Sequence, residues 1–190
     1  MRLDRTTSLL LIVDLQTGLL PVIEGGEQAV TEAAWLAGLS RMLDVPVWLT
    51  EQYPAGLGSV DPQLLAAAPD ALRWEKVHFD AHEEPPFARA LAELGRKQVV
   101  ICGSEAHICV LQTALGLLAA DYRVYWLAEA CVSRRHEEAR LARERVSAAG
   151  GVVISADMAA YEWLERCDDK HFKEAHRGFL KPRATRQLRF

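Results

Sequence analysis

The stretch QVVICGSEAHICV, residues 98–110, carries the pattern that decides the fold. Its first part, Gln98 to Cys102, is apolar at almost every position, which is typical of a parallel strand covered on both faces. A short loop follows, and apolar positions then recur at helical spacing from Ile108 to Ala120. The stretch therefore predicts a buried strand, a short turn and a helix that begins near Cys109.

The same alternation of buried strand and helix extends along the chain in both directions. Parallel strands need crossover connections, so this alternation predicts a three-layer α/β/α fold with a doubly wound sheet of about six parallel strands. The other expected strands are 8–13, 45–49, 123–127 and 152–154, with a weaker one at 72–75. The other expected helices are 27–43, 87–94 and 136–149.

The composition is that of a globular protein with 190 residues, half of them hydrophobic and a quarter charged. We expect one domain over residues 1–190. The net charge of -4 creates no basic field for nucleic acid, and no apolar stretch approaches the ~18 residues of a membrane span. The first residues lack the cleavage site of a signal peptide, which favours a cytoplasmic protein without nucleic-acid or membrane partners.

A basic tail begins at about residue 170. It contains seven Lys or Arg residues and one acid, Glu174, and Phe179, Leu180 and Phe190 interrupt the charge. One interpretation is a solvated terminal helix and tail, and the other is an arm that packs on a neighbouring subunit. The apolar residues within the tail indicate a surface that needs a partner, so we expect a homo-oligomer.

Candidate catalytic residues follow three of the expected strands. Asp14 ends the first strand, Lys76 follows Trp74 near the end of the weak strand, and Cys109 lies in or near the first turn of a helix. Ligands of an open parallel sheet bind at the carboxyl ends of its strands, so the three side chains can meet there. Each also has a structural explanation, as a helix cap, a solvated surface charge and a buried thiol, respectively.

The four cysteines, Cys102, Cys109, Cys131 and Cys167, have neither C-x-x-C nor zinc-ligand spacing. We expect free thiols, and Cys102 within its apolar run should be a core residue. At Cys109 the unpaired N–H groups and the positive end of a helix would stabilise a thiolate and could hold an oxyanion. No glycine-rich phosphate loop follows any strand, so dinucleotide and ATP chemistry are not indicated.

In combination these motifs resemble the isochorismatase-like cysteine hydrolases, a family that also includes nicotinamidases. The resemblance runs from about residue 8 to residue 180. It rests on LIVDLQ at 11–16, on Lys76 and on GSEAHICV at 103–110. The loop TEQYP at 50–54, followed by GLG at 56–58, is similar to the isochorismatase-domain-containing subgroup.

The resemblance implies a role for each matching residue. Asp14 would take the thiol proton, Lys76 would hold the thiolate and keep Asp14 ionised, and Cys109 would attack the carbonyl carbon of a small amide to form a thioester. The lysine and the helix end should then lower the pKa of Cys109 below its free value of about 8.5. The family also implies a cis peptide bond between Ser104 and Glu105, with the N–H groups of Glu105 and Cys109 as the oxyanion hole.

One departure from the family concerns the metal. Nicotinamidases carry an Asp-x-His metal motif where this chain has Glu51-Gln52-Tyr53, so we expect neither zinc, iron nor any other cofactor. The residues that could line a substrate pocket are Gln16, Gln52, Tyr53, His78 and His107.

The sequence is also compatible with two other functions. One is a cysteine-independent vinyl-ether hydrolase that uses only Asp14 and Lys76, and the other is a non-catalytic binding or assembly protein. Isochorismatases that cleave a vinyl ether lack the nucleophilic cysteine, so Cys109 argues against isochorismate as the substrate. The substrate itself depends on loops whose shapes the sequence does not define.

Overall fold

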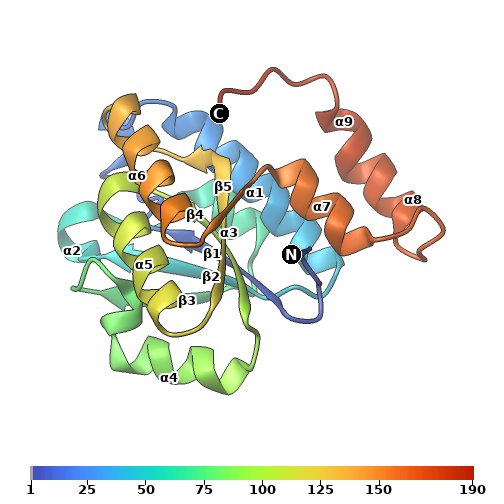
Figure 1. The fold of residues 1–190 in the computed structure, drawn as a ribbon. Coiled ribbons are helices and arrows are strands. Elements are labelled where there is room, and N and C mark those ends of the chain that lie inside the picture. The colour runs from blue at the N-terminus through green and yellow to red at the C-terminus, as the bar shows by residue number, and fades with distance from the viewer. Residues whose placement is uncertain (1) are drawn as a thin grey trace.

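A computed structural model describes residues 2–190. Its centre is a six-stranded sheet in the order β3-β2-β1-β4-β5-β6, and every neighbouring pair is parallel (Figure 1). The predicted α/β fold is confirmed. The strands are β1 (Ser8–Val13), β2 (Val47–Gln52), β3 (Leu72–Lys76), β4 (Gln98–Gly103), β5 (Arg123–Cys131) and β6 (Val152–Ile154).

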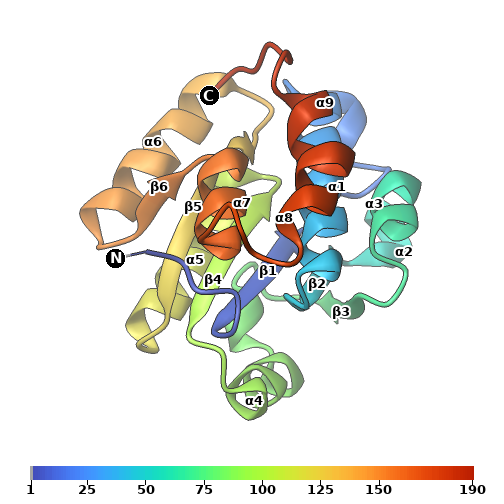
Figure 2. The same cartoon turned by 90° about the vertical axis from the view of Figure 1, so that its right-hand side faces the viewer.

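Helices cover both faces of the sheet and make the outer layers (Figures 1 and 2). One face carries α1 (Gly26–Met42), α3 (Pro62–Ala67) and α7 (Ala156–Leu164), and the other carries α4 (Pro85–Leu94), α5 (Leu111–Ala119) and α6 (His136–Ala148). Short elements are α2 (Pro54–Leu57), α8 (Phe172–Ala175), α9 (Lys181–Arg183), 3₁₀ turns at Leu20–Val22 and Ala81–Glu83, and π-helical turns at Ala106–Val110 and His176–Leu180. Within residues 2–190, no helix has the length and apolar character needed to cross a bilayer.

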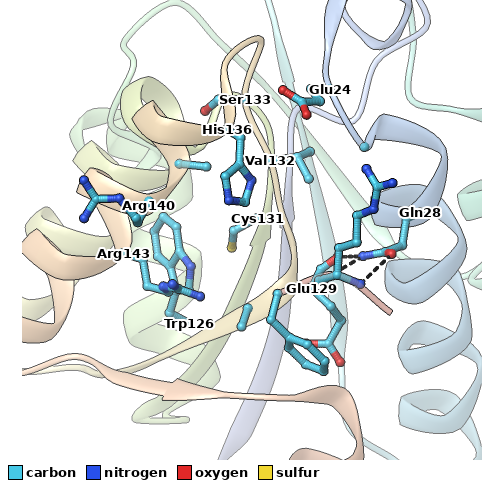
Figure 3. A pocket seen from close by; sticks show the side chains of 15 residues that line it. Glu24, Gln28, Trp126, Glu129, Cys131, Val132, Ser133, His136, Arg140 and Arg143 are labelled. Carbon is cyan, nitrogen blue, oxygen red and sulfur yellow. Dashed lines mark hydrogen bonds between the residues drawn. The ribbon is translucent and has the colours of Figure 1, made fainter. Parts of the chain in front are cut away.

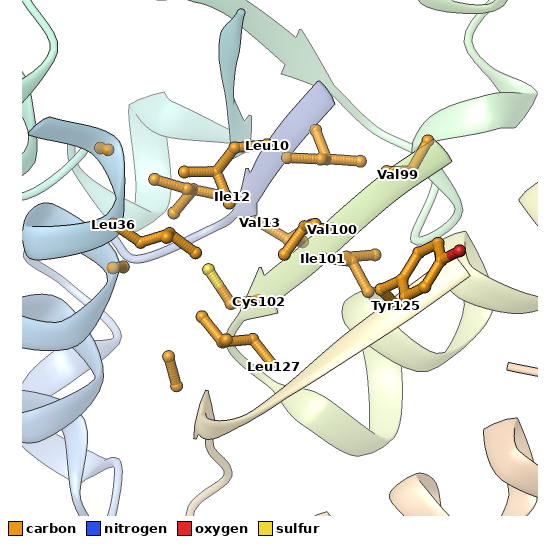
Figure 4. Close-up of a cluster of buried hydrophobic side chains, with 14 of the residues drawn as sticks. Leu10, Ile12, Val13, Leu36, Val99, Val100, Ile101, Cys102, Tyr125 and Leu127 are labelled. Atoms are coloured by element: carbon orange, nitrogen blue, oxygen red, sulfur yellow. The ribbon is translucent and has the colours of Figure 1, made fainter. Parts of the chain in front are cut away.

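Burial on both faces explains why the central strands are apolar at every position. All residues of β1, β2 and β4 are buried, and side chains from β1 and β4 pack together in the middle of the sheet (Figure 4). Cys102 is fully buried there, as its place in the apolar run predicted. Burial of this kind is the main source of stability for the fold.

Strand β2 differs from its predicted range because it begins at Val47 and continues to Gln52. The prediction ended at the last apolar residue, but a strand ladder is formed by backbone groups and does not require apolar side chains. Gln52 pairs in register with Lys76 of β3, so two polar side chains share the end of neighbouring strands. Strand β5 is also longer than predicted and ends at Cys131.

The position of β1 beside β4 creates the topological switch point of the sheet. The chain leaves β1 toward β2 and leaves β4 toward β5, on opposite faces, so the two connections diverge (Figure 1). Ligand sites of doubly wound sheets form at such a point, outside the carboxyl ends of the strands. Asp14 and the loop that leads to Cys109 both lie there.

The C-terminal segment, with α8 and α9, lies beside α1 (Figure 2). A buried arginine, Arg183, anchors it to the chain's own core. Arg183 is 3% exposed and forms ion pairs with Glu32 of α1 at 2.7 Å, Glu129 of β5 at 2.8 Å and Asp157 of α7 at 2.7 Å. Most residues of 171–190 are exposed, as expected of a solvated tail, but carboxylates from three elements hold one of its cations in the interior. This anchor lies within the same chain.

Glycine is required at residue 103, where β4 passes β1 most closely. Gly103 has φ +137°, and a Cβ atom there would lie 1.9 Å from the carbonyl oxygen of Val13. We expect Gly103→Ala to lower the free energy of unfolding by about 2 kcal/mol or more, measured by urea denaturation. Gly95→Ala is the control, because Gly95 has φ +69° but no atom within 4 Å of its Cβ position, so only about 1 kcal/mol should be lost. Equal losses would contradict the steric argument.

The second prediction concerns the C-terminal anchor. Arg183→Met should leave Glu32 and Glu129 buried without their cation and cost about 3–5 kcal/mol of stability. The exposed Arg177, which is also in the C-terminal segment, provides the matched control as Arg177→Met. If thermal and chemical denaturation gave the two variants the same stability, the C-terminal segment would not be anchored as described.

Candidate active site

Asp14 is held in place by three neighbouring segments. It follows β1 with φ 49° and is fully buried. Its Oδ1 accepts a hydrogen bond from the Thr50 hydroxyl at 2.6 Å, its Oδ2 lies 2.7 Å from the Lys76 Nζ, and its carbonyl oxygen accepts from the Ser104 hydroxyl at 2.8 Å. The carboxylate is thus fixed by β2 and β3, and the backbone of Asp14 by the loop after β4.

Lys76 is a buried cation and not a surface charge. It is the last residue of β3, and its side chain is 1% exposed. Besides the ion pair with Asp14, its ammonium donates to the Gln52 Oε1 at 2.6 Å and to the carbonyl oxygens of His78 and Phe79, each at 3.4 Å. These acceptors offset the loss of water around the ammonium group.

Cys109 is the third member of the same group of side chains. It is the fourth residue of the π-helical turn Ala106–Val110 and is 6% exposed. Its Sγ lies 3.9 Å from the Gln52 Oε1, and Asp14 and Lys76 are close enough to shift the pKa of the thiol. The structure therefore brings together the three residues that the sequence places on separate segments.

The expected low pKa of Cys109 is wrong for the unliganded protein. Burial raises the pKa of this thiol to about 12, and the adjacent Asp14 carboxylate raises it further than Lys76 lowers it. A thiol removed from water favours its neutral form, and a neighbouring anion has the same effect. Cys109 is therefore a protonated thiol beside a carboxylate at neutral pH.

The loop before Cys109 contains a backbone donor that has no partner within the chain. The peptide bond between Ser104 and Glu105 is cis. Among residues 2–190, no acceptor pairs with the Glu105 N–H. The Cys109 N–H lies in the π-helical turn that follows. The neighbouring N–H groups have partners within the chain. The Ala106 N–H donates to the Val132 carbonyl, and the His107 N–H donates to the Ser133 hydroxyl. The Ile108 N–H donates to the Glu105 carbonyl.

An arginine that the sequence reasoning missed fixes this loop from outside. The Arg134 Nε donates to both carboxylate oxygens of Glu105 at 2.9 Å, its Nη2 pairs with the Glu105 Oε1, and its backbone N–H donates at 3.1 Å. Burial raises the pKa of Glu105, but these bonds outweigh it and the net shift is downward. The signal was the position of Arg134, just after β5 at the same edge of the sheet.

The two candidate glutamines have different places in the site. Gln52 binds Lys76 and contacts Cys109, as described above. Gln16 is fully buried, and its amide donates to the carbonyl oxygens of Gln52 at 3.1 Å and Gly58 at 2.6 Å, while its Oε1 accepts from the Gln52 N–H at 2.8 Å. Gln16 therefore positions Gln52. Tyr53 is 59% exposed at the outer edge, where its N–H donates to the Lys76 carbonyl.

The two candidate histidines point to other partners. The His78 Nδ1 lies 2.8 Å from the Glu84 Oε1, in a loop outside the catalytic group. The His107 Nδ1 lies 2.9 Å from the Ser133 Oγ, on the side of the loop that follows β5. Neither imidazole makes a hydrogen bond to Asp14, Lys76 or Cys109. Thr50, which the sequence reasoning did not single out, is in direct contact with Asp14.

Glu51 and Gln52, which stand where nicotinamidases have a metal motif, form hydrogen bonds within this chain. The Glu51 Oε1 accepts a hydrogen bond from the Val60 N–H at 2.8 Å, and the Gln52 amide oxygen is bound to Lys76. Across the part of the chain that the structure describes, no three His, Cys, Asp or Glu side chains are grouped so that they could hold a metal ion.

Comparisons with known proteins agree on one family. The isochorismatase domain model matches residues 8–158. Isochorismatase domain-containing protein 2A of Mus musculus is 32% identical over 179 residues, which cover 93% of this chain and 84% of the mouse protein. The structure described as MAR1 ribonuclease from Caenorhabditis elegans is similar with a TM-score of 0.89 and 30% identity, over 95% of this chain and 93% of that chain.

Two YcaC structures are also similar. YcaC from Pseudomonas aeruginosa, solved with hexane-2,5-diol and covalent acrylamide, has a TM-score of 0.85 and 25% identity, over 96% of this chain and 94% of its own. The Escherichia coli YcaC gene product, described as an octameric hydrolase of unknown specificity, has a TM-score of 0.85 and 23% identity over 97% of each chain. The second likeness shows the fold alone.

The raised pKa of Cys109 gives a third prediction. The rate at which iodoacetamide alkylates Cys109 should rise about tenfold per pH unit from pH 7 to 10 without a plateau, because only the thiolate reacts. Asp14→Asn removes the negative charge that raises this pKa, so alkylation at pH 8 should become at least several-fold faster. Peptide mass spectrometry in a Cys167→Ser background measures the rate without interference from the exposed Cys167.

Lys76→Met is the opposite change to Asp14→Asn. It removes the cation that lowers the thiol pKa, so labelling of Cys109 should become slower than in the parent protein. Slower labelling in the Asp14→Asn protein, or a plateau of the rate below pH 9 in the parent, would show that other groups set the pKa of the Cys109 thiol.

Proposed function

The chain belongs to the isochorismatase family, and from this premise we propose that it is a cysteine hydrolase that cleaves the C–N bond of a small amide-type molecule. The family supports a hydrolase. The observation that carries the finer proposal is the contact of Asp14, Lys76 and Cys109 at the switch point of the sheet. A nucleophile, a proton acceptor and a cation at one buried point have the arrangement that nucleophilic catalysis requires.

The first step forms a bond between the Cys109 Sγ and the carbonyl carbon of the substrate. The thiol proton passes to the Asp14 carboxylate as the sulfur attacks, so a free thiolate does not have to persist. The carbonyl oxygen becomes an oxyanion, which the N–H groups of Glu105 and Cys109 can bind. The ammonium of Lys76 stabilises the negative charge that the carboxylate and sulfur share.

The second step breaks the C–N bond. The intermediate collapses, and Asp14 returns its proton to the leaving nitrogen, which departs as ammonia or an amine. Cys109 is left as a thioester. Water then attacks the thioester carbon and gives a proton to Asp14. The S–C bond breaks, the proton returns to sulfur, and the carboxylic acid product leaves.

A small substrate fits the burial of the site. Asp14 is fully buried, Lys76 is 3% exposed and Cys109 is 6% exposed, so the reacting atoms lie below the surface. A polymer could not bring its backbone to this point without a large opening of the surrounding loops. The covalent acrylamide in P. aeruginosa YcaC supports the presence of a reactive nucleophile in proteins of this fold, because acrylamide is an electrophile.

Ribonuclease activity is the second candidate, and the similarity to the C. elegans protein motivates it. The net charge of -4 and the burial of Cys109 favour the small-molecule proposal. Incubation with a fluorescent single-stranded RNA, in parallel with the amide substrates, distinguishes the two activities.

Assembly and location remain proposals. A homo-oligomer is supported by the octameric E. coli YcaC and by Tyr53, Val77 and Phe79, which are each more than half exposed next to the site. A cytoplasmic location and independence from zinc, iron or another cofactor stay predictions from the sequence.

The fourth prediction tests the catalytic proposal with a panel of small amides, carbamates and ureides. The parent protein should release ammonia or amine from at least one of them. Cys109→Ala should reduce kcat at least 10³-fold, because the nucleophile is removed, and Asp14→Asn should reduce it about 10²–10⁴-fold because proton transfer is lost.

The Cys167→Ser protein is the control for this experiment. It removes an exposed thiol away from the site and keeps Asp14, Lys76 and Cys109, so it should keep the activity of the parent protein. Full turnover by Cys109→Ala would favour the cysteine-independent hydrolase that uses Asp14 and Lys76. Absence of turnover on every substrate, with Cys109 intact, would favour a binding or assembly protein.

A further inference from the structure

Strand β3 lies at one edge of the sheet, and its outer side has no partner. The sheet begins with β3, which pairs only with β2 among the residues that the structure describes (Figure 2). Leu72 is 52% exposed, and Arg73 and Glu75 are exposed as well, so this part of the chain leaves the edge uncovered. An exposed edge strand presents a row of free N–H and C=O groups, which can pair with a further strand.

The backbone groups of Arg73 and Glu75 are the ones that face away from the sheet. The Lys76 carbonyl oxygen accepts a hydrogen bond from the Tyr53 N–H at 3.0 Å, so the backbone groups of Lys76 point toward β2. Backbone groups of successive residues in a strand point to opposite sides. Those of Trp74 therefore also face β2, and those of Arg73 and Glu75 face outward, where they have no partner among residues 2–190.

The side chains of Arg73 and Glu75 carry opposite charges that are not paired. Trp74, between them, packs on Trp48 and on Phe87 of α4. Side chains alternate along a strand, so Arg73 and Glu75 share the other face of the sheet. Neither side chain forms an ion pair or a hydrogen bond with any residue that the structure describes. The edge therefore offers one cation and one anion side by side on a single face.

This pattern is complementary to itself in one antiparallel register. If two copies of β3 pair about a two-fold axis at Trp74, Arg73 lies opposite Glu75 of the partner subunit, and Glu75 lies opposite Arg73 of the partner subunit. These are the residues whose backbone groups face outward, so each facing pair can exchange both of its N–H···O bonds. An axis at Arg73 or at Glu75 would instead place like charges opposite each other, which is destabilising.

The charges on this edge do not have the arrangement that protects an edge strand from pairing. Protective charges must repel each other when the same edges of two copies meet. Arg73 and Glu75 attract each other across the axis at Trp74, and opposite charges that face each other on neighbouring strands stabilise the pair. The edge is therefore suited to a second copy of itself.

We propose that β3 binds β3 of a second copy of this chain, antiparallel, about a two-fold axis at Trp74. The proposal rests on the homo-oligomer of the proposed function and adds its surface and its register. A two-fold contact uses the same patch on both copies, so it needs a patch that is complementary to itself. Arg73 and Glu75 make β3 such a patch.

Exposed apolar side chains at the two ends of β3 add to this contact. Leu72 is 52% exposed and Val77 is 69% exposed. The axis brings the start of one strand beside the end of the other, so Leu72 and Val77 of the partner subunit come to the same end of the interface, where burial favours association. The Val77 N–H already donates to the Glu84 Oε1 at 2.8 Å, so the new backbone bonds are confined to β3 itself.

Light scattering during size-exclusion chromatography, at up to high micromolar concentration, measures the mass of the whole protein and its variants. The parent should have at least twice the mass of one chain. Arg73→Glu and Glu75→Arg each place like charges opposite each other at both facing pairs. Each variant alone should therefore have half of the parental mass or less, and circular dichroism checks that it is folded.

The two variants together give the sharpest result. In a mixed pair, residues 73 and 75 are both acidic in one copy and both basic in the other, so every facing pair is again attractive. Equal amounts of the Arg73→Glu and Glu75→Arg proteins should therefore restore the parental mass on mixing. The double variant Arg73→Glu/Glu75→Arg should restore it without mixing, because its facing pairs are the parental ones reversed.

Arg145→Glu is the matched control, with the same change in net charge as Arg73→Glu. Arg145 is exposed on α6. That helix flanks the pocket of about 260 Å³ along β5 that Figure 3 shows, and three strands separate β5 from β3. The Arg145→Glu protein should keep the parental mass. A second measurement uses the parent alone: the Arg73 and Glu75 amides should exchange hydrogen more slowly as the protein concentration rises.

The outcomes separate this interface from the rest of the account. A parent with the mass of one chain would overturn both the interface and the homo-oligomer. An oligomeric parent whose two single variants keep its mass, or single variants that dissociate but do not combine on mixing, would overturn the interface alone. The measurements use no substrate, so none of these results changes the turnover expected of the hydrolase.

Discussion

The buried ion pair between Lys76 and Asp14 is the interaction on which the rest of the site depends. The two residues end β3 and β1, and β2 lies between those strands, so their 2.7 Å contact requires the register of three strands. Burial of two charges is costly unless both are paired and hydrogen bonded, and here Thr50 and Gln52 supply the additional bonds. The pair is therefore better explained by function than by stability. It places a carboxylate and a cation beside one thiol.

The fold was predictable because its strongest signals are local. Strands that are buried on both faces are apolar throughout, and the helices between them repeat apolar residues at helical spacing. The alternation of strands such as 8–13 and 98–102 with helices such as 27–43 therefore indicated a parallel sheet. Strand ends were less predictable, since Glu51 and Gln52 extend β2 by backbone pairing alone. The packing of Arg183 could not be predicted, because Glu32, Glu129 and Asp157 lie far from it in sequence.

The site was predictable in its members but not in its electrostatics. Asp14 follows β1, Lys76 ends β3 and Cys109 lies in the turn after β4. All three positions are at one edge of the sheet once the sheet is parallel. Their effect on the thiol depends on depth and distance. Cys109 is buried next to a carboxylate, so its pKa rises to about 12, whereas the helix end and the lysine alone would have lowered it. Thr50 contacts Asp14 because of the strand register, and Arg134 contacts Glu105 because of the loop shape. No local sequence pattern reveals either contact.

If the Cys109 thiol is the nucleophile, hydrolysis must pass through a covalent acyl intermediate on its sulfur. The most direct test is intact-protein mass spectrometry of the enzyme, quenched in acid during turnover of an amide substrate. We expect an added mass equal to the acyl group, located on the peptide that contains Cys109 and removed by hydroxylamine. Turnover without any acyl adduct on Cys109, in a protein whose hydrolysis is as fast with Cys109→Ala, would contradict it.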